Sequence, residues 1–308
     1  EMIPLRAVCG KIAAMVDRQR LTLEAPFKPC GDQGQAIDAL FNDRTGDPLP
    51  AAGSEGAHER ETPFGSSDGG TDLTVGIVWV TLGIPSDHLQ AAHRLIIDPS
   101  GDAGVHRYAV LSCLRVVLEV ASIAWWLTQP GIGARTRLER TLTFAQHSVT
   151  LRDRAERIRT EPNDLSYLKA IQEIIDRVAA EHDLLRLTGE KKRRIPNATQ
   201  LIGDQFEAFG GDRGDAVSIY GLLSEFTHGN FLGSMLGYRR DTAGAPVLKP
   251  RVPLGEIAIA ANYASVGLSL TVEAFIEFMG WDVEPWREAT QPHLSAIEAV
   301  AHVTKDID

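Results

Sequence analysis

Cysteine is scarce in this sequence: its 308 residues include only Cys9, Cys30 and Cys113. Three cysteines at such wide spacing form neither a disulfide framework nor a zinc-binding pattern. Cys113 stands in an apolar run, which is typical of a small residue in a protein core. The cysteine content therefore favours a reducing compartment, and we expect a cytoplasmic protein.

Basic residues are fewer than acidic ones, with 31 Lys and Arg against 41 Asp and Glu, so the formal net charge is −10. This balance disfavours nucleic acids and anionic membranes as partners, because both require positive potential on the protein surface. Apolar residues make up 44% and charged residues 23% of the chain, which is typical of a globular fold and too apolar for disorder.

Uncharged runs long enough to cross a membrane are also missing. Residues 108–127 are mostly apolar but include Arg115 and Glu119, which a lipid-facing helix tolerates poorly. Residues 257–272 carry no charge but fall short of the ~20 residues that a spanning helix needs. We therefore predict two buried helices of a soluble protein and expect no membrane partner.

The motifs of several enzyme classes are absent. The chain has no Gly-rich phosphate-binding loop, no nucleophile-elbow serine and no His-Glu-x-x-His zinc motif. It also lacks the Asp-rich motif that binds prenyl diphosphates. The sequence therefore predicts no cofactor, and it disfavours nucleotide-dependent enzymes and terpene cyclases.

The apolar spacing predicts an all-α protein, a multi-helix bundle of about 8–10 helices. We divide the chain into N-terminal helices at 1–43, a flexible loop or linker at 44–72 and a main helical bundle domain at 73–308. The 44–72 segment is rich in Gly, Ser, Pro and Asp, so we expect little regular structure there. Residues 73–84 have strand-like β-branched content but no partner strand, which favours a helix. The remaining helices are expected at 4–20, 33–42, 86–97, 106–128, 134–160, 164–187, 197–209, 215–236, 254–280 and 284–304.

Two of these helices carry further expectations. Ser86 follows a proline and is predicted to cap a helix that begins there. Residues 257–272 include many small side chains, which let neighbouring helices approach closely. We expect this helix to lie at the centre of the bundle or at the subunit interface of a homo-oligomer.

Arg115 and Glu119 are the most informative polar residues, because they interrupt a very apolar helix. They are four residues apart and share a face. A charge buried alone costs several kcal/mol, so both must be paired, hydrogen-bonded or exposed to a wet cavity. The pair is either a structural ion pair between helices or the polar wall of a pocket, and Trp125 and Trp126 could form the floor of such a pocket.

A second polar stripe lies in the segment YGLLSEFTHGNF. Tyr220, Ser224 and His228 are spaced by four residues, and Glu225 lies three residues before His228. A histidine beside a carboxylate can act as a general base. The alternative is a hydrogen-bonded histidine between helices, and in both cases we expect His228 to be at least half buried.

Two short motifs suggest other functions. Glu225-x-x-His228 matches half of a helical di-iron site, but the other match, Glu55-x-x-His58, lies in the Gly/Ser-rich segment where we expect a loop, so we expect no metal. Arg140…His147 and Arg287…His293 have the Arg-x4–6-His spacing of HEPN ribonucleases. Such spacings also arise by chance, so they do not by themselves indicate this family.

The sequence resembles a group of uncharacterised bacterial helical proteins in the segments RVVLEVASIAWWLTQPGIGARTRLER, IPNATQLI and YGLLSEFTHGN. The group shares an Arg-x3-Glu helix followed by tryptophans and a proline, and a later Tyr-x3-Ser-x3-His-Gly helix. The resemblance covers roughly residues 85–280 and suggests a distant kinship to HEPN-like bundles. It implies one recurring constellation, made of Arg115, Glu119, Tyr220, Ser224 and His228.

Our leading hypothesis is a small-molecule enzyme or ligand-binding protein whose polar site lies where the 106–128 and 215–236 helices meet. Glu119 and His228 are the acid/base candidates, and Arg115 binds an anion or orients the ligand. Tyr220, Ser224, Glu225 and Trp125 are the candidate substrate-binding residues. The alternatives are an HEPN-like ribonuclease or toxin-type protein and a non-enzymatic scaffold or oligomer subunit.

This hypothesis makes a geometric prediction. The polar stripes of the two helices must approach closely enough for direct or one-water hydrogen bonds. The sequence leaves open whether the protein is an enzyme.

Overall fold

The computed structural model describes residues 50–62, 70–96, 107–157, 166–184, 195–228, 238–239, 249–250 and 254–305. These residues form nine helices and one two-stranded ladder, so the predicted all-α helical bundle is confirmed. The helices expected at 4–20 and 33–42 lie outside the described residues.

Most helices have the bounds that the apolar spacing predicts. The structure contains α3 (Glu55–Arg60), α4 (Gly70–Ile96), α5 (Arg107–Thr128), α6 (Ala134–Arg157), α7 (Ser166–Glu181), α8 (Ala198–Ala208), α9 (Arg213–Thr227), α11 (Leu254–Met279) and α12 (Glu284–Lys305). The strands β1 (Tyr238–Arg239) and β2 (Lys249–Pro250) pair antiparallel.

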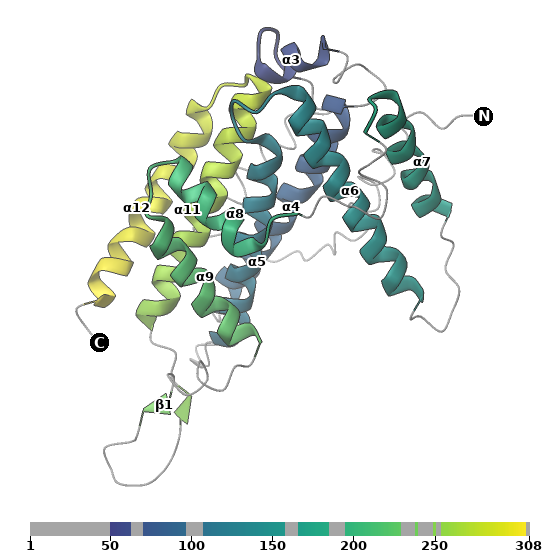
Figure 1. Ribbon diagram of the computed structural model, residues 1–308. Coiled ribbons are helices and arrows are strands. Elements are labelled where there is room, and N and C mark those ends of the chain that lie inside the picture. Colours follow the sequence, from purple (N-terminus) through teal and green to yellow (C-terminus); the bar gives the residue numbers. More distant parts are fainter. Residues whose placement is uncertain are drawn as a thin grey trace, which may run out of the picture.

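Helices α5 and α11 form the centre of the bundle (Figure 1). Helix α5 packs against α4, α6, α8, α9 and α11, whereas α11 also contacts α3 and α12. Ala260 and Ala264 of α11 are fully buried, and their small side chains let the neighbouring helices approach closely. The expectation that residues 257–272 lie at the centre of the bundle is therefore confirmed.

The two central helices are also the two described helices that are long and apolar enough to cross a membrane. The apolar segments are Tyr108–Thr128 and Glu256–Met279, of which 56% and 61% are buried inside the bundle. Apolar residues at the core of a helical bundle have the same composition as a membrane span.

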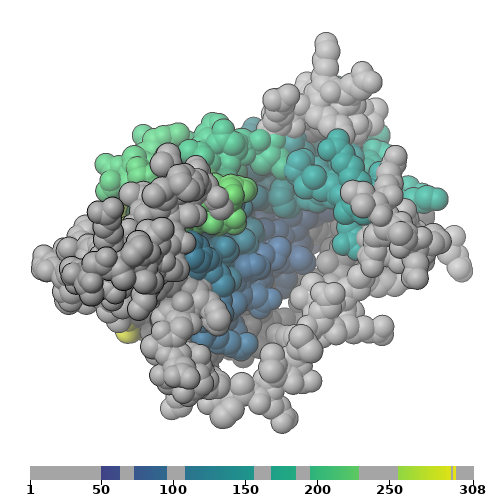
Figure 2. Space-filling model, turned by 90° about the horizontal axis from the view of Figure 1, so that it is seen from below, coloured from purple at the N-terminus to yellow at the C-terminus, as the bar shows by residue number. Residues whose placement is uncertain are grey.

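Helices α6 and α7 lie on one side of the bundle and have a smaller core of their own (Figure 1). Leu138 and Leu142 of α6 pack with Val178 of α7 in this core. Figure 2 shows that the blue residues of α4 and α5 are set between green α9 and teal α6 when the molecule is seen from below. Helix α5 also packs against α8 and α9, and α9 carries the second polar stripe. The candidate site is therefore described at the contact between α5 and α9.

Helix α4 corrects one prediction and confirms another. It is continuous over Gly70–Ile96, so residues 73–84 are helical as favoured, but no helix begins at Ser86. Pro85 lies inside the helix, and Ser86 is buried. The cap signal fails because Leu82 before the proline and Leu89 after it lie on one helix face and both pack in the same core.

The prediction of little regular structure at 44–72 is wrong for residues 55–60, which form α3, and for residues 70–72, which belong to α4. Ser54 caps this helix, because its Oγ accepts a hydrogen bond from the Ala57 N–H at 3.0 Å. Gly56 is required by a close approach to α11, since a Cβ atom there would lie 2.9 Å from the Phe278 carbonyl oxygen. Residues 44–49 and 63–69 lie outside the described residues.

Candidate functional site

Arg115 and Glu119 form an ion pair on the face of α5 that meets α9. The Arg115 Nε donates a hydrogen bond to Glu119 Oε1 at 2.9 Å, and Nη2 lies 2.8 Å from the same oxygen. The side chains are 15% and 27% exposed, so water screens the pair only in part. Such a pair is strong enough to fix the position of both groups.

The polar stripe of α9 joins this ion pair directly. The Tyr220 hydroxyl donates to Glu119 Oε1 at 2.5 Å, and Arg115 Nη1 lies 3.1 Å from His228 Nε2. The prediction that the two stripes are within hydrogen-bonding distance is therefore confirmed. Tyr220 is only 8% exposed, and the Arg115 guanidinium carbon lies 5.8 Å from the centre of its ring.

The contact between Arg115 and His228 defines the state of the imidazole. A guanidinium nitrogen can only donate, so Nε2 of His228 must accept. In this contact the second ring nitrogen, Nδ1, carries the proton. In this arrangement His228 presents an N–H donor, and its basic nitrogen is occupied by Arg115.

Glu119 concentrates its hydrogen bonds on one oxygen. Oε1 accepts from Arg115 Nε and from Tyr220, and it is also the oxygen next to Arg115 Nη2. Within the described part of the chain, no hydrogen bond reaches Oε2. A ligand group can therefore contact the carboxylate directly only through Oε2, whereas Oε1 can exchange a proton along its hydrogen bond with Tyr220.

The pKa shifts follow from this geometry. Burial raises the pKa of Tyr220, and donation of its proton to the Glu119 carboxylate raises it further. Burial would lower the pKa of Arg115, but its hydrogen bonds to Tyr220 and Glu119 outweigh burial and raise it. Tyr220 is therefore a neutral donor and Arg115 a fixed cation at neutral pH.

A cavity of about 320 Å³ lies beside this network, between α8 and α9. Tyr220 and His228 belong to both the network and the cavity wall, and the predicted residues Ser224 and Glu225 also line it. The full lining consists of Thr199, Val217, Tyr220, Gly221, Ser224, Glu225 and His228. Thr199, Val217 and Gly221 were not predicted, although Val217, Gly221, Ser224 and His228 follow one helical stripe.

Two expectations about the site are wrong. His228 is exposed rather than half buried, because α9 ends at Thr227 and His228 is its C-cap. Residues 229–236 of the predicted 215–236 helix lie outside the described residues. Trp125 is 2% exposed and packs in the core, since it lies about 240° round the helix from Glu119. It does not line the cavity.

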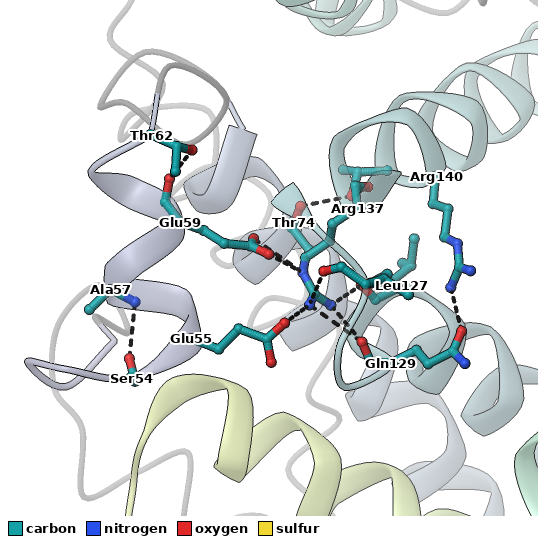
Figure 3. Close-up of polar contacts among 12 residues, drawn as sticks. Ser54, Glu55, Ala57, Glu59, Thr62, Thr74, Leu127, Gln129, Arg137 and Arg140 are labelled. Carbon is teal, nitrogen blue, oxygen red and sulfur yellow. Dashed lines mark hydrogen bonds and ion pairs between the residues drawn. The ribbon is translucent and has the colours of Figure 1, made fainter. Parts of the chain in front are cut away.

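Arg137 is a buried charge that the sequence did not single out (Figure 3). It is 1% exposed, and its guanidinium donates to Glu59 and Glu55 of α3 and to the carbonyl oxygen of Leu127. Its neighbours in the charged run ARTRLER gave no sign of burial. Arg137 of α6 therefore hydrogen-bonds both to α3 and to the C-terminal end of α5. It does not line the cavity.

Arg140, of the Arg140…His147 pair, is also occupied. Its Nη1 donates to the Trp126 carbonyl at 2.6 Å and to Gln129 Oε1 at 2.8 Å (Figure 3 draws the second of these bonds). Burial, together with the charge of Arg137, lowers the pKa of Arg140 to about 10, so it remains a cation at neutral pH. His147 is exposed. In the other pair, Arg287 binds Glu273 and Glu284.

No cluster of three or more His, Cys, Asp or Glu side chains that could hold a metal occurs among the described residues. Comparisons with known protein families, curated proteins and solved structures find no match to this chain. The resemblance to bacterial helical proteins stays a prediction. Function is therefore inferred from the chemistry of the α5–α9 network and its cavity.

The raised pKa of Tyr220 gives a testable pH dependence. The folded state holds this proton more tightly than the unfolded chain does, so its stabilising effect is fully present below the ordinary tyrosine pKa of about 10. It is lost as the pH rises through the higher pKa of the folded state. We expect urea unfolding to show a steeper loss of stability above about pH 10 in the native protein than in Tyr220→Phe. Equal slopes would contradict the proton placement.

Proposed function

We propose that this protein binds a small polar molecule in the cavity between α8 and α9 and exchanges a proton with it. The observation that carries this proposal is the half-buried network of Arg115, Glu119, Tyr220 and His228, which opens on a cavity of about 320 Å³. Pockets that combine an apolar wall with a few convergent polar groups are typical ligand sites.

The network supports a defined role for each side chain. Tyr220 is the proton carrier, because it lines the cavity and its hydroxyl donates to Glu119 Oε1. A ligand proton that moves to the Tyr220 oxygen lets the tyrosine proton pass to Glu119, which ends as a carboxylic acid. Arg115 orients both partners and stabilises the carboxylate before transfer. His228 supports the ligand through its Nδ1–H.

The ribonuclease alternative has less support. Arg140 donates to α5 and lies over the Trp126 ring at 5.1 Å, so it is held by the fold rather than presented to a substrate. The net charge of −10 also disfavours RNA. The scaffold alternative predicts that the cavity binds nothing, and the experiment below separates it from the proposal.

The experiment compares two variants with the same chemical change. A library of small polar metabolites is screened against the native protein by native mass spectrometry and thermal shift. We expect Tyr220→Phe to weaken binding of the ligand by about tenfold or more, because a good hydrogen bond is worth about 1–1.5 kcal/mol. Tyr108→Phe is the control, since Tyr108 is exposed on α5 and does not line the cavity.

Two results would contradict the proposal. The first is a screen in which no small molecule binds the native protein. The second is a ligand whose affinity is the same for the native protein and for Tyr220→Phe.

A further inference from the structure

Hydrogen-bond acceptors outnumber donors around the cavity between α8 and α9. Tyr220 has a single hydroxyl proton and donates it to Glu119 Oε1, so its oxygen offers the cavity lone pairs only. Glu225 lines the cavity with a carboxylate, which is an acceptor only. Glu225 makes no hydrogen bond or ion pair with another described residue. The hydroxyls of Ser224 and Thr199 adapt to either role, and the Nδ1–H of His228 is the fixed donor among the described side chains that line the cavity.

The charged groups around the cavity are also unbalanced, with negative charge in excess. The positive charge of Arg115 is matched by Glu119, and all three guanidinium nitrogens are in contact with Glu119 or His228. Nε2 of His228 is occupied by its contact with Arg115. Among the described residues, Glu225 therefore remains as the unmatched charge, and those that line the cavity offer no free cation to an anionic ligand.

We propose that the ligand of this cavity is a small organic amine that binds as its ammonium ion; this rests on the proposed function of the same site. The ammonium group supplies the N–H donors that the Glu225 carboxylate and the Tyr220 oxygen lack, and its charge balances Glu225. The carbon part of the amine packs against Val217 and Gly221 of the same helix face.

The proton exchange described above fits an amine. An ammonium ion that gives one proton to the Tyr220 oxygen becomes a neutral amine, while the tyrosine proton passes to Glu119 Oε1. No oxidant, reductant or further reactant is needed. The neutral amine is a nucleophile, whereas the ammonium ion is not.

The test uses three probes of nearly equal shape that differ in charge: benzylamine, benzyl alcohol and benzoate. Binding to the full chain at neutral pH is measured by calorimetry and by ligand-observed NMR. We expect benzylamine, which is a cation at this pH, to bind about tenfold more tightly than benzyl alcohol, the effect of roughly one charge-assisted hydrogen bond. Benzoate should bind most weakly.

Variants at Glu225 show whether this carboxylate causes the preference. Glu225→Gln should bring the affinities for benzylamine and benzyl alcohol close together, whereas Glu225→Asp should keep the preference for the amine. Glu173→Gln is the matched control, because Glu173 is exposed on α7, far along the chain from the cavity residues. Circular dichroism melting checks that all three variants fold.

The outcomes separate the two proposals. If benzyl alcohol or benzoate binds as tightly as benzylamine, the ligand is not a cation, but the cavity remains a binding site. If the amine is preferred equally in Glu225→Gln, the preference arises elsewhere and the assignment is wrong. If none of the three probes binds and the metabolite screen also finds nothing, the proposed function fails together with this inference.

Discussion

Arg137→Met should lower the free energy of unfolding by about 3–5 kcal/mol, the cost of removing one partner from a buried ion pair. The substitution keeps most of the aliphatic stem but leaves Glu59, which is 8% exposed, without its cation. It also leaves the Leu127 carbonyl at the end of α5 without its donor. Urea unfolding measures the loss, and Arg154→Met, at an exposed position of the same helix, should change stability little.

The loss of stability in Arg137→Met should become larger as the pH rises. Burial raises the pKa of Glu59 even though Arg137 lowers it, and removing Arg137 raises it further. A buried carboxyl with a raised pKa is tolerated when protonated, so the variant should be least destabilised at acidic pH and lose stability as the pH rises. A loss of stability that is the same at pH 5 and pH 8 would contradict this role of Arg137. A loss below about 1 kcal/mol would also show that Arg137 does not stabilise the contacts of α6 with α3 and α5.

Glu119→Ala should have the second largest effect, and it should act on the site as well as on the fold. The substitution leaves Arg115, 15% exposed, without its anion and the Tyr220 proton without its acceptor. We expect a loss of stability of about 1–3 kcal/mol, the cost of unsatisfied buried polar groups. Ligand binding should fall by about tenfold or more, because Tyr220 is no longer oriented.

A double-mutant cycle distinguishes this role from simple loss of a side chain. Glu119→Ala and Tyr220→Phe remove the same hydrogen bond, so their combined effect on stability should be smaller than the sum of the two by about 0.5–3 kcal/mol. Glu173→Ala provides the control, since it should be additive with Tyr220→Phe. Additivity of Glu119→Ala with Tyr220→Phe would contradict the contact between the two residues.

Helix positions were predictable where the local signal and the packing agree. Asn197, at the start of the helix expected at 197–209, caps α8, with its Oδ1 accepting from the Gln200 N–H at 2.8 Å. Ser86 carries a similar local signal, but α4 runs past it because the buried apolar face of the helix does not stop there. Local capping signals therefore fail where tertiary packing stabilises a longer helix.

The candidate site was predictable in part for a physical reason. A charged residue inside an apolar helix must have a partner, so the sequence predicts Arg115 and Glu119 as site residues. Tyr220 is the polar residue of α9 that binds them. Arg137 gave no such signal, because it stands among other charged residues of α6 and only its contacts with α3 reveal its burial. The exposure of His228 was missed because the sequence does not show where α9 ends.

The docking of α3 has a consequence for the order in which the fold is completed. The Ala51 N–H donates to the Met279 carbonyl at 2.7 Å, and Gly56 lies against Phe278, so α3 rests on residues more than 200 positions later in the chain. A six-residue helix is not stable alone in water. On the ribosome, α3 and Arg137 emerge long before the end of α11 that supports α3. We therefore expect α3 to dock last, so that Arg137 gains its carboxylate partners only after nearly the whole chain has been synthesised.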